Sequence, residues 1–255
     1  MIPLRDQEYL RERFARELTG AVRIDLFTQR RLPIFIPGRE ECAFCEETQQ
    51  LLKELSALSD KIRLTVHEFS EAAQEAARLG VDRVPGIVLR GALNRPIRFF
   101  GLPGGHEFPA FVEGVIDVSR GKVDLATETA RQLKRLKSDV SLEAFVTPTC
   151  PSCPAMARLA HKLALESPRV RADVIEIMEF PRLIERHNIS AVPVTVIGGR
   201  VALVGAMSEQ TLMAQIMQFA QRKALQPAAG ALGPTSPVEQ QRPQERRESG
   251  IILPG

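Results

Sequence analysis

The pattern of hydrophobic residues along the chain predicts the same order of strands and helices twice. Apolar residues recur every three or four positions in the segments expected to be helical, and they alternate with polar residues in the expected strands. In the first copy of this order, the pattern predicts an opening helix over 4–18 and strands at 22–28, 62–69, 87–89 and 97–100. It also predicts helices after Cys45, at 71–79 and at 106–119. A helix over 122–137 is expected to connect this copy to the second copy.

The second copy repeats the first at a fixed distance along the sequence. It predicts strands at 140–146, 170–177, 194–197 and 201–204, and helices from the second cysteine pair to 165, at 181–187 and at 208–223. An ungapped offset of 108 positions relates 42–91 to 150–199 and aligns Leu51 with Leu159 and Leu55 with Leu163. Such a long period indicates a duplicated supersecondary unit.

The expected architecture is therefore α/β, with two tandem units that each carry a central mixed sheet flanked by helices. We expect a first unit over 1–120 and a second over 121–225. Residues 226–255 are rich in Pro, Gln and Arg and have no periodicity, so we expect a disordered tail there.

Composition narrows the function classes. The chain has 255 residues, 44% of them hydrophobic, and its net charge of +3 comes from 34 basic and 31 acidic residues that are interspersed. This mild charge, with no Trp and one Tyr, argues against nucleic-acid binding. The N-terminus carries charge within five residues and no apolar run approaches the roughly 18 residues that span a bilayer, so a cytoplasmic protein is expected.

The four cysteines form two C-x-x-C pairs, Cys42 with Cys45 and Cys150 with Cys153. In a reducing compartment such pairs indicate redox catalysis or metal binding. A dithiol that exchanges with disulfides needs one exposed thiolate and a second thiol that resolves the mixed disulfide. Because a helix N-terminus stabilises a thiolate, we expect Cys42 and Cys150 to be the nucleophiles and Cys45 and Cys153 the resolving thiols.

Each pair is followed by a proline at the same distance. Pro85 lies 43 positions after Cys42, and Pro193 lies 43 positions after Cys150. Each alone would be an ordinary turn before a strand, but the shared spacing favours a role in the site.

Acidic residues distinguish the two pairs and mark the strands before them. Glu40, Glu41, Glu46 and Glu47 surround the first pair, whereas Thr, Pro and Ser flank the second. We therefore expect the Cys150 thiol to have the lower pKa and the second pair the more oxidising potential. In the preceding strands, Asp25 and Glu143 occupy equivalent places. Each carboxylate either accepts the proton of a resolving thiol or escapes to solvent at a sheet edge.

The chain resembles a known family at this point. It is similar to the protein disulfide oxidoreductases of thermophilic archaea and bacteria, also called glutaredoxin-like domain proteins, which have tandem thioredoxin folds. The resemblance covers roughly residues 1–225 and rests on FVTPTCPSCP at 145–154, FGLPGGHEF at 100–108 and AVP at 191–193.

The resemblance implies that Pro85 and Pro193 are cis, that the backbone of Val84 and Val192 contacts substrate peptide, and that two thioredoxin folds lie side by side in one body. It also implies oxidation, reduction and isomerisation of protein disulfides, with thioredoxin reductase as the electron donor. Two features depart from the family pattern: a longer segment between Phe27 and Cys42, which could form a lid or a partner surface, and the tail after 225.

Two alternatives remain. A dithiol electron carrier to a peroxidase would resemble the N-terminal domain of the alkyl hydroperoxide reductase flavoprotein, but that family is expected to carry one C-x-x-C rather than two. A zinc or cluster module could also use four cysteines, although 105 residues separate Cys45 from Cys150. Since the chain has no G-x-G-x-x-G fingerprint, we expect no flavin, nicotinamide or other cofactor.

Overall fold

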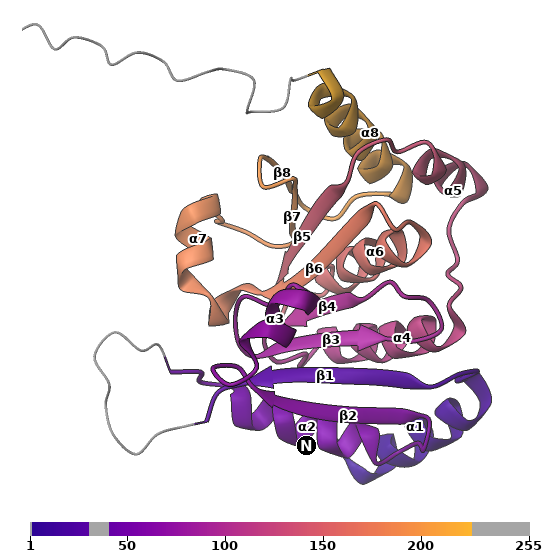
Figure 1. Ribbon diagram of the computed structural model, residues 1–255, viewed down its shortest axis with the longest axis vertical. Helices are drawn as coiled ribbons and strands as arrows, with labels where there is room; N and C mark the ends of the chain where they lie inside the picture. The colour runs from indigo at the N-terminus through magenta and orange to yellow at the C-terminus, as the bar shows by residue number, and fades with distance from the viewer. Residues whose placement is uncertain (1, 31–40, 226–255) are drawn as a thin grey trace, which may run out of the picture.

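A computed structural model describes residues 2–30 and 41–225. Its strands are β1 (Val22–Thr28), β2 (Ile62–Glu68), β3 (Gly86–Arg90), β4 (Ile97–Phe100), β5 (Val140–Val146), β6 (Val170–Glu176), β7 (Val194–Ile197) and β8 (Val201–Val204). They form one mixed sheet of eight strands in the order β2-β1-β3-β4-β6-β5-β7-β8, which Figure 1 shows running from β2 at the bottom to β8 at the top.

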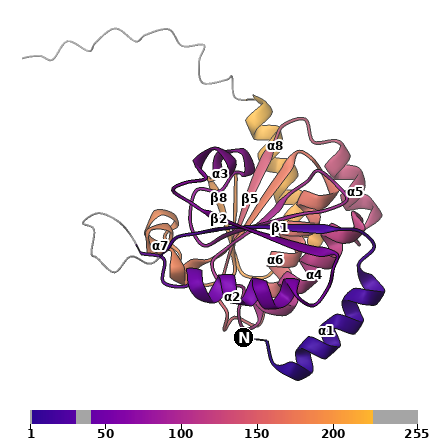
Figure 2. The ribbon, with the colours of Figure 1, turned by 60° about the horizontal axis from the view of Figure 1, so that its bottom comes forward.

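Helices cover both faces of this sheet. They are α1 (Leu4–Glu17), α2 (Cys45–Ser56), α3 (Ala73–Leu79), α4 (Glu107–Arg120), α5 (Thr127–Lys134), α6 (Cys153–Glu166), α7 (Pro181–His187) and α8 (Glu209–Leu225), with a 3₁₀ turn at Ile177–Glu179. Figure 2 shows α3 and α7 on one side of the sheet, and α1, α4 and α6 on the other. The buried apolar residues accordingly form one cluster under α3 and α7 and a larger one under the remaining helices.

The sheet contains the same unit twice. We call α1 to α4 the first half and β5 to α8 the second half. In each half, two parallel strands (β1 with β2, β5 with β6) lie beside an antiparallel hairpin (β3 with β4, β7 with β8). The predicted α/β fold with mixed sheets and flanking helices is confirmed, and the two units share one continuous sheet.

The halves join where β4 lies parallel to β6. At this junction Arg98 faces Asp173 in register, and their buried side chains form an ion pair. On the opposite face, His161 Nε2 of α6 donates to the Arg98 carbonyl oxygen at 2.9 Å, and burial lowers the pKa of His161 to about 4, so the ring is neutral. The junction is thus a buried polar contact inside an apolar core.

Asp173→Asn is expected to destabilise the protein by about 3 kcal/mol, because it leaves the buried Arg98 guanidinium without its counter-charge. Chemical denaturation monitored by circular dichroism measures this. The control is Asp139→Asn, since Asp139 forms an exposed ion pair with Arg169 and should cost under about 1 kcal/mol. Equal effects of the two substitutions would show that the junction ion pair has no special weight.

Most element boundaries lie within two residues of the sequence prediction, and the connector helix differs most. The connector helix was expected over 122–137 but spans only Thr127–Lys134, because Ala126 is extended and its N–H donates to Glu209 of α8. The strand expected to reach 177 ends at Glu176, whose carboxylate accepts the N–H groups of the next 3₁₀ turn. Residues 31–40 of the longer segment between Phe27 and Cys42, expected as a lid or a partner surface, lie outside the described residues, as does the whole expected tail over 226–255.

Candidate redox sites

Both cysteine pairs lie at the start of a helix and are closed as disulfides. Cys42 is bonded to Cys45, the first residue of α2, and Cys150 is bonded to Cys153, the first residue of α6. The Cα atoms are 5.5 Å apart in the first pair and 5.4 Å apart in the second. The leading cysteine of each pair therefore precedes a helix N-terminus, where the free N–H groups and the helix dipole favour a thiolate.

Burial separates the roles within each pair. Cys45 and Cys153 are enclosed, with 1% and 0% exposure, whereas Cys42 is half-buried and Cys150 keeps 9%. A substrate disulfide can reach the leading sulfur more readily than the second. This order of exposure supports the predicted division into attacking and resolving cysteines.

Gln29 contacts both cysteines of the first pair. Its backbone N–H donates to Cys45 Sγ at 3.3 Å, and its Oε1 accepts the Cys42 N–H at 3.0 Å. Gln29 follows the last residue of β1, so the strand directly positions the disulfide.

The second pair is held by different neighbours. Cys150 Sγ lies 3.8 Å from the Val192 carbonyl oxygen and 3.6 Å from the Ser152 hydroxyl. The Cys150 N–H donates to the Thr147 carbonyl. The Val192 contact brings the second Val-Pro loop against the leading sulfur.

Both Val-Pro loops have the same backbone. The Val84–Pro85 and Val192–Pro193 peptide bonds are cis, as the resemblance implies. Each proline is buried, and each valine is half-buried. The proline carbonyls accept the N–H groups of Gly101 and Gly205, respectively, so each loop is tied to the turn after β4 or β8.

The charge around the two pairs differs. Glu41, Glu46 and Glu47 are exposed beside the first pair, and the first turn of α6 carries no acidic residue. Negative charge next to a thiol opposes its ionisation, although water screens exposed carboxylates.

In the reduced protein, the Cys150 thiol should ionise at lower pH than the Cys42 thiol. Iodoacetamide alkylation rates measured against pH for each cysteine, with mass spectrometry to separate the peptides, test this. Replacing Glu46 and Glu47 by Gln should bring the Cys42 pKa closer to that of Cys150. A Cys42 thiol that ionises first would contradict the prediction.

The two predicted proton acceptors have different surroundings. Asp25 is buried, and its carboxylate accepts from Arg90 Nε at 3.0 Å and from His67 Nε2 at 3.0 Å. Glu143 is half-buried in β5, in register with Asp173 and Val196. Within the described residues, Glu143 makes no ion pair or hydrogen bond. The acid of the first half is thus already neutralised by a cation, whereas that of the second half is not.

The structure places a third acid, Glu107, at the start of α4, the helix that packs on α6. Helices α4 and α6 run in the same direction. Arg158, five residues after Cys153 in α6, pairs with Glu113, which lies six residues after Glu107 in α4. Arg158 also pairs with Asp117, one turn further along α4. Just before the two helices, the His106 N–H donates to the Pro148 carbonyl at 2.9 Å. Glu107 and Cys153 therefore lie at the same level of two neighbouring helices.

The Glu107 carboxyl group is buried without a partner. The residue is 1% exposed, and neither carboxylate oxygen accepts a hydrogen bond from any described residue. Burial raises the pKa of Glu107 to about 7. A carboxyl group with this pKa can both take and return a proton near neutral pH.

Residues 101–106 connect the two sites. Gly101 N–H donates to Pro85 of the first site, and His106 N–H donates to Pro148 of the second. Between them, Leu102 N–H donates to Glu179 at 2.7 Å. Burial raises the pKa of Glu179 to about 7.

Gly105→Ala should loosen the contact with the second site and lower stability by at least about 1–2 kcal/mol. Gly105 has φ +54°, and a Cβ there would lie 2.4 Å from the Pro148 carbonyl oxygen. The control is Gly199→Ala, since Gly199 has φ +68° but open space around its Cβ position. Thermal unfolding and the reduction potential of the Cys150 pair are the readouts. If both substitutions had the same effect on that potential, the contact with Pro148 would not influence the site.

Sequence reasoning missed Gln29 and Glu107. Gln29 directly follows a strand and has no distinguishing neighbour in the sequence. Glu107 lies in the quoted FGLPGGHEF segment, but an acid in the first turn of a helix is ordinarily explained by the helix dipole. Only the packing of α4 on α6 reveals that it is buried.

Comparisons with known proteins agree with this geometry. Residues 140–218 match the family described as Thioredoxin domain. A protein disulfide oxidoreductase from Aeropyrum pernix K1 is 26% identical with a TM-score of 0.77, covering 87% of this chain and 95% of that one. A structure of the F subunit of alkyl hydroperoxide reductase, from Enterococcus faecalis, is 26% identical with a TM-score of 0.72, covering 84% and 98%.

Among curated proteins, the F subunit of alkyl hydroperoxide reductase in Xanthomonas campestris pv. phaseoli is 28% identical over 177 residues, which are 69% of this chain and 32% of that protein. The chain thus spans about one third of the length of the curated relatives it matches. It is a thioredoxin-fold protein with two C-x-x-C sites. Both kinds of relative support the predicted class of chemistry, thiol–disulfide exchange.

Proposed function

We propose that this protein is a thiol–disulfide oxidoreductase that exchanges disulfides with protein substrates through two C-x-x-C sites. The observation that carries the proposal is the second site, where Cys150 lies at a helix N-terminus, 3.8 Å from the Val192 carbonyl of the cis-proline loop. We also propose that residues 1–120 and 121–225 are the two thioredoxin-like units, each with its own site.

In the reducing direction, the Cys150 thiolate attacks one sulfur of a substrate disulfide. The substrate S–S bond breaks, a mixed disulfide forms, and the first substrate thiolate leaves with a proton from solvent. Cys153 then loses its proton to a nearby base and attacks Cys150 Sγ. This releases the second substrate thiolate and closes the Cys150–Cys153 disulfide, so two electrons pass from the protein to the substrate.

Glu107 is the base that we assign to the resolving step at the second site. Its pKa of about 7 and its lack of partners suit a group that exchanges a proton with a thiol. Glu143 remains the alternative base there, and Asp25 the candidate at the first site. Pro85 and Pro193 shape the two Val-Pro loops that face the substrate, and the backbone of Val84 and Val192 pairs with the substrate peptide.

An external dithiol must reduce the oxidised sites, and we propose thioredoxin reductase as that donor.

Within the described residues no group of three His, Cys, Asp or Glu side chains is placed to hold a metal ion. None of the described helices is long and apolar enough to cross a membrane. The proposed location is the cytoplasm.

A second candidate function is transfer of electrons to a peroxidase. It is favoured by the similarity to the F subunit of alkyl hydroperoxide reductase, which extends over most of this chain. Both functions use the same dithiol chemistry and differ in the acceptor.

One experiment tests the chemistry and separates the acceptors. All four cysteines are followed by differential alkylation and mass spectrometry across a dithiothreitol redox series in metal-free buffer, with bound zinc quantified. Two reversible disulfides at distinct potentials are expected. Thiols that stay protected until a chelator is added, with stoichiometric zinc, would overturn the oxidoreductase proposal. The reduced protein is then mixed with a disulfide-linked peptide or with an oxidised peroxiredoxin, and the faster acceptor identifies the function.

A further inference from the structure

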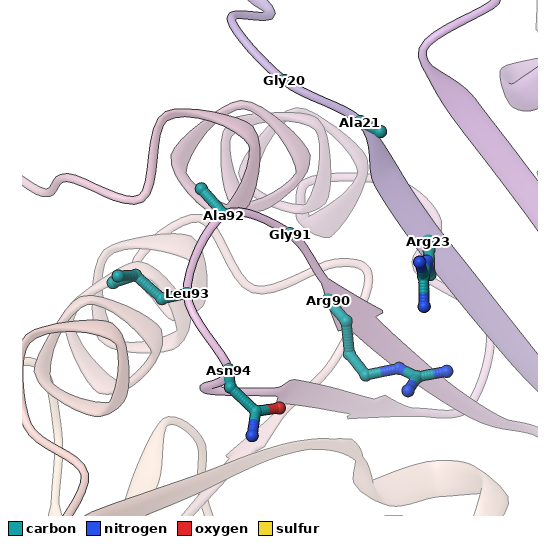
Figure 3. A pocket seen from close by; sticks show the side chains of 8 residues that line it. All are labelled: Gly20, Ala21, Arg23, Arg90, Gly91, Ala92, Leu93 and Asn94. Carbon is teal, nitrogen blue, oxygen red and sulfur yellow. The ribbon is translucent and has the colours of Figure 1, made fainter.

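A pocket far from the cysteines lies at the opposite end of the first half. It has a volume of about 370 Å³ and is formed where β1 begins and where β3 turns toward β4. Small-molecule sites commonly have volumes of this order. Its lining includes Arg23, Arg90 and Asn94 beside the apolar Ala92 and Leu93, as Figure 3 shows.

The two arginines of the pocket belong to a row of three. Arg23 of β1 is in register with Arg63 of β2 on one side and with Arg90 of β3 on the other. Residues paired in register point to the same face of a sheet, and neighbouring strands are about 4.8 Å apart. Three guanidinium groups therefore project from adjacent strands on one face. Figure 3 shows Arg23 and Arg90 on the same side of their strands.

Arg90 is held in place by a buried carboxylate of the neighbouring strand β1. Its Nε donates to Asp25 at 3.0 Å, and Asp25 also accepts from His67. This buried carboxylate fixes the Arg90 guanidinium and neutralises one charge of the row. Above it, Glu75 and Arg78 of α3 form an exposed ion pair that adds no net charge.

The other two arginines, Arg23 and Arg63, have no counter-charge in the described part of the chain. Within the described residues, neither Arg23 nor Arg63 makes an ion pair or a hydrogen bond, and both are exposed. Like charges directly opposite each other on a sheet are destabilising. With Asp25 subtracted, the row of Arg23, Arg63 and Arg90 carries a net charge of +2. Arg63 does not line the pocket, but it lies on the strand next to Arg23, so its charge adds to a positive field that attracts an anion.

The duplicated half shows that the fold does not require this row. There, the register positions equivalent to Arg63, Arg23 and Arg90 hold Arg171, Ser141 and Gly198. Arg171 pairs with Asp173. The row of three arginines is thus peculiar to the first half, although both halves have the same order of strands and helices.

We propose that this pocket binds a small molecule through a phosphate group. Guanidinium groups bind phosphate with two parallel hydrogen bonds, and Arg23 presents such a fork to the pocket. Arg90, whose Nε and Nη2 donate to Asp25, adds the N–H groups that Asp25 does not use. The Asn94 amide adds a donor, and Leu93 and Ala92 offer an apolar wall to the remainder of the ligand. The site is separate from both C-x-x-C pairs, because those pairs follow the ends of β1 and β5, whereas the pocket lies at the start of β1.

Calorimetric titration with inorganic phosphate, alongside succinate and sodium chloride at matched ionic strength, tests the proposal. The oxidised full-length protein is used, with Arg23→Ser as the variant because serine occupies the equivalent position in the second half. Arg11→Ser, which removes an exposed arginine of α1, is the matched control for net charge. Wild-type protein and Arg11→Ser should bind phosphate with equal affinity, and Arg23→Ser should bind at least tenfold more weakly.

The variant also has readouts without ligand. Arg23→Ser should unfold at a higher temperature than wild type in phosphate-free buffer of low ionic strength, because it removes the repulsion within the row. Its rate of disulfide exchange should be unchanged. Binding of succinate but not phosphate would reassign the pocket to dicarboxylates and overturn the proposal. So would a chloride effect equal to that of phosphate, or equal losses in Arg23→Ser and Arg11→Ser.

Discussion

Cys150→Ser, made in a protein whose first site is already removed by Cys42→Ser and Cys45→Ser, is expected to lower the rate of disulfide exchange by at least about 10³-fold. The reason is that a serine hydroxyl is not ionised at neutral pH and cannot replace the thiolate that attacks the substrate. The measurement is the initial rate of reduction of a fluorescent disulfide-linked peptide.

Cys153→Ser in the same background is the matched comparison. It keeps the Cys150 thiolate and loses only the buried resolving thiol. The variant should therefore complete the first step and accumulate a mixed disulfide with the peptide, visible as an added mass. A mixed disulfide on Cys153 in the Cys150→Ser variant would reverse the assigned roles.

The same substitutions can be made in the first site. If the second site is removed and the first is left intact, the remaining rate reports what Cys42 and Cys45 contribute alone. Cys42 is more exposed than Cys150, but it lies among the carboxylates of α2. We expect a functional but slower site, because its thiolate population is smaller at neutral pH.

Glu107→Gln is expected to slow the resolving step at the second site by about 10²- to 10⁴-fold, the usual weight of a general base. The glutamine has the same shape and cannot take a proton. With wild-type protein, the rate of disulfide closure from the mixed disulfide should rise with an inflection near pH 7, the pKa of Glu107. Rapid-mixing alkylation across pH measures this rate, and the inflection should be absent in the variant.

Glu107→Gln should raise the stability of the folded protein even though it slows the resolving step. Burial raises the pKa of Glu107 from 4.5 to about 7, so the folded protein holds a proton that the unfolded chain has lost. The stability of wild-type protein therefore falls as pH rises from 4.5 to about 7, by up to about 3 kcal/mol from this group. Glu107→Gln removes this loss, and its gain in stability should be larger at pH 8 than at pH 5.

A protein that is more stable yet slower would identify Glu107 as a group retained for the reaction. Glu143→Gln is the comparison, because Glu143 is the other acid proposed for this site. If Glu143→Gln removes the inflection near pH 7 and Glu107→Gln does not, the base is Glu143. If neither does, water takes the proton of Cys153 directly.

The position of Glu107 depends on how the two halves are joined. It belongs to the last helix of the first half, but it lies beside the active-site helix of the second half. The junction between β4 and β6, with its Arg98–Asp173 ion pair, brings α4 next to α6. In the proposed mechanism, the second site therefore uses a residue from the other half.

Much of the site was determined by the sequence itself. The C-x-x-C pairs, the prolines 43 positions later and the offset of 108 fix which residues correspond between the halves. Apolar periodicity placed Cys45 and Cys153 at the start of helices, and strand alternation placed β1 and β5 before them. The helix and strand assignments are local, because they depend on residues within one or two turns of helix or along one strand.

Tertiary structure decided the features that depend on contacts between distant segments. The sequence marked Asp25 and Glu143 as equivalent acids, but only Asp25 is neutralised by an arginine, because the second half has Gly198 in place of Arg90. It gave Glu107 no special role, since burial of that carboxyl group arises only when α4 packs on α6. The pKa of a side chain and the partner of a charge are set by what surrounds them in space, and a linear pattern does not contain that information.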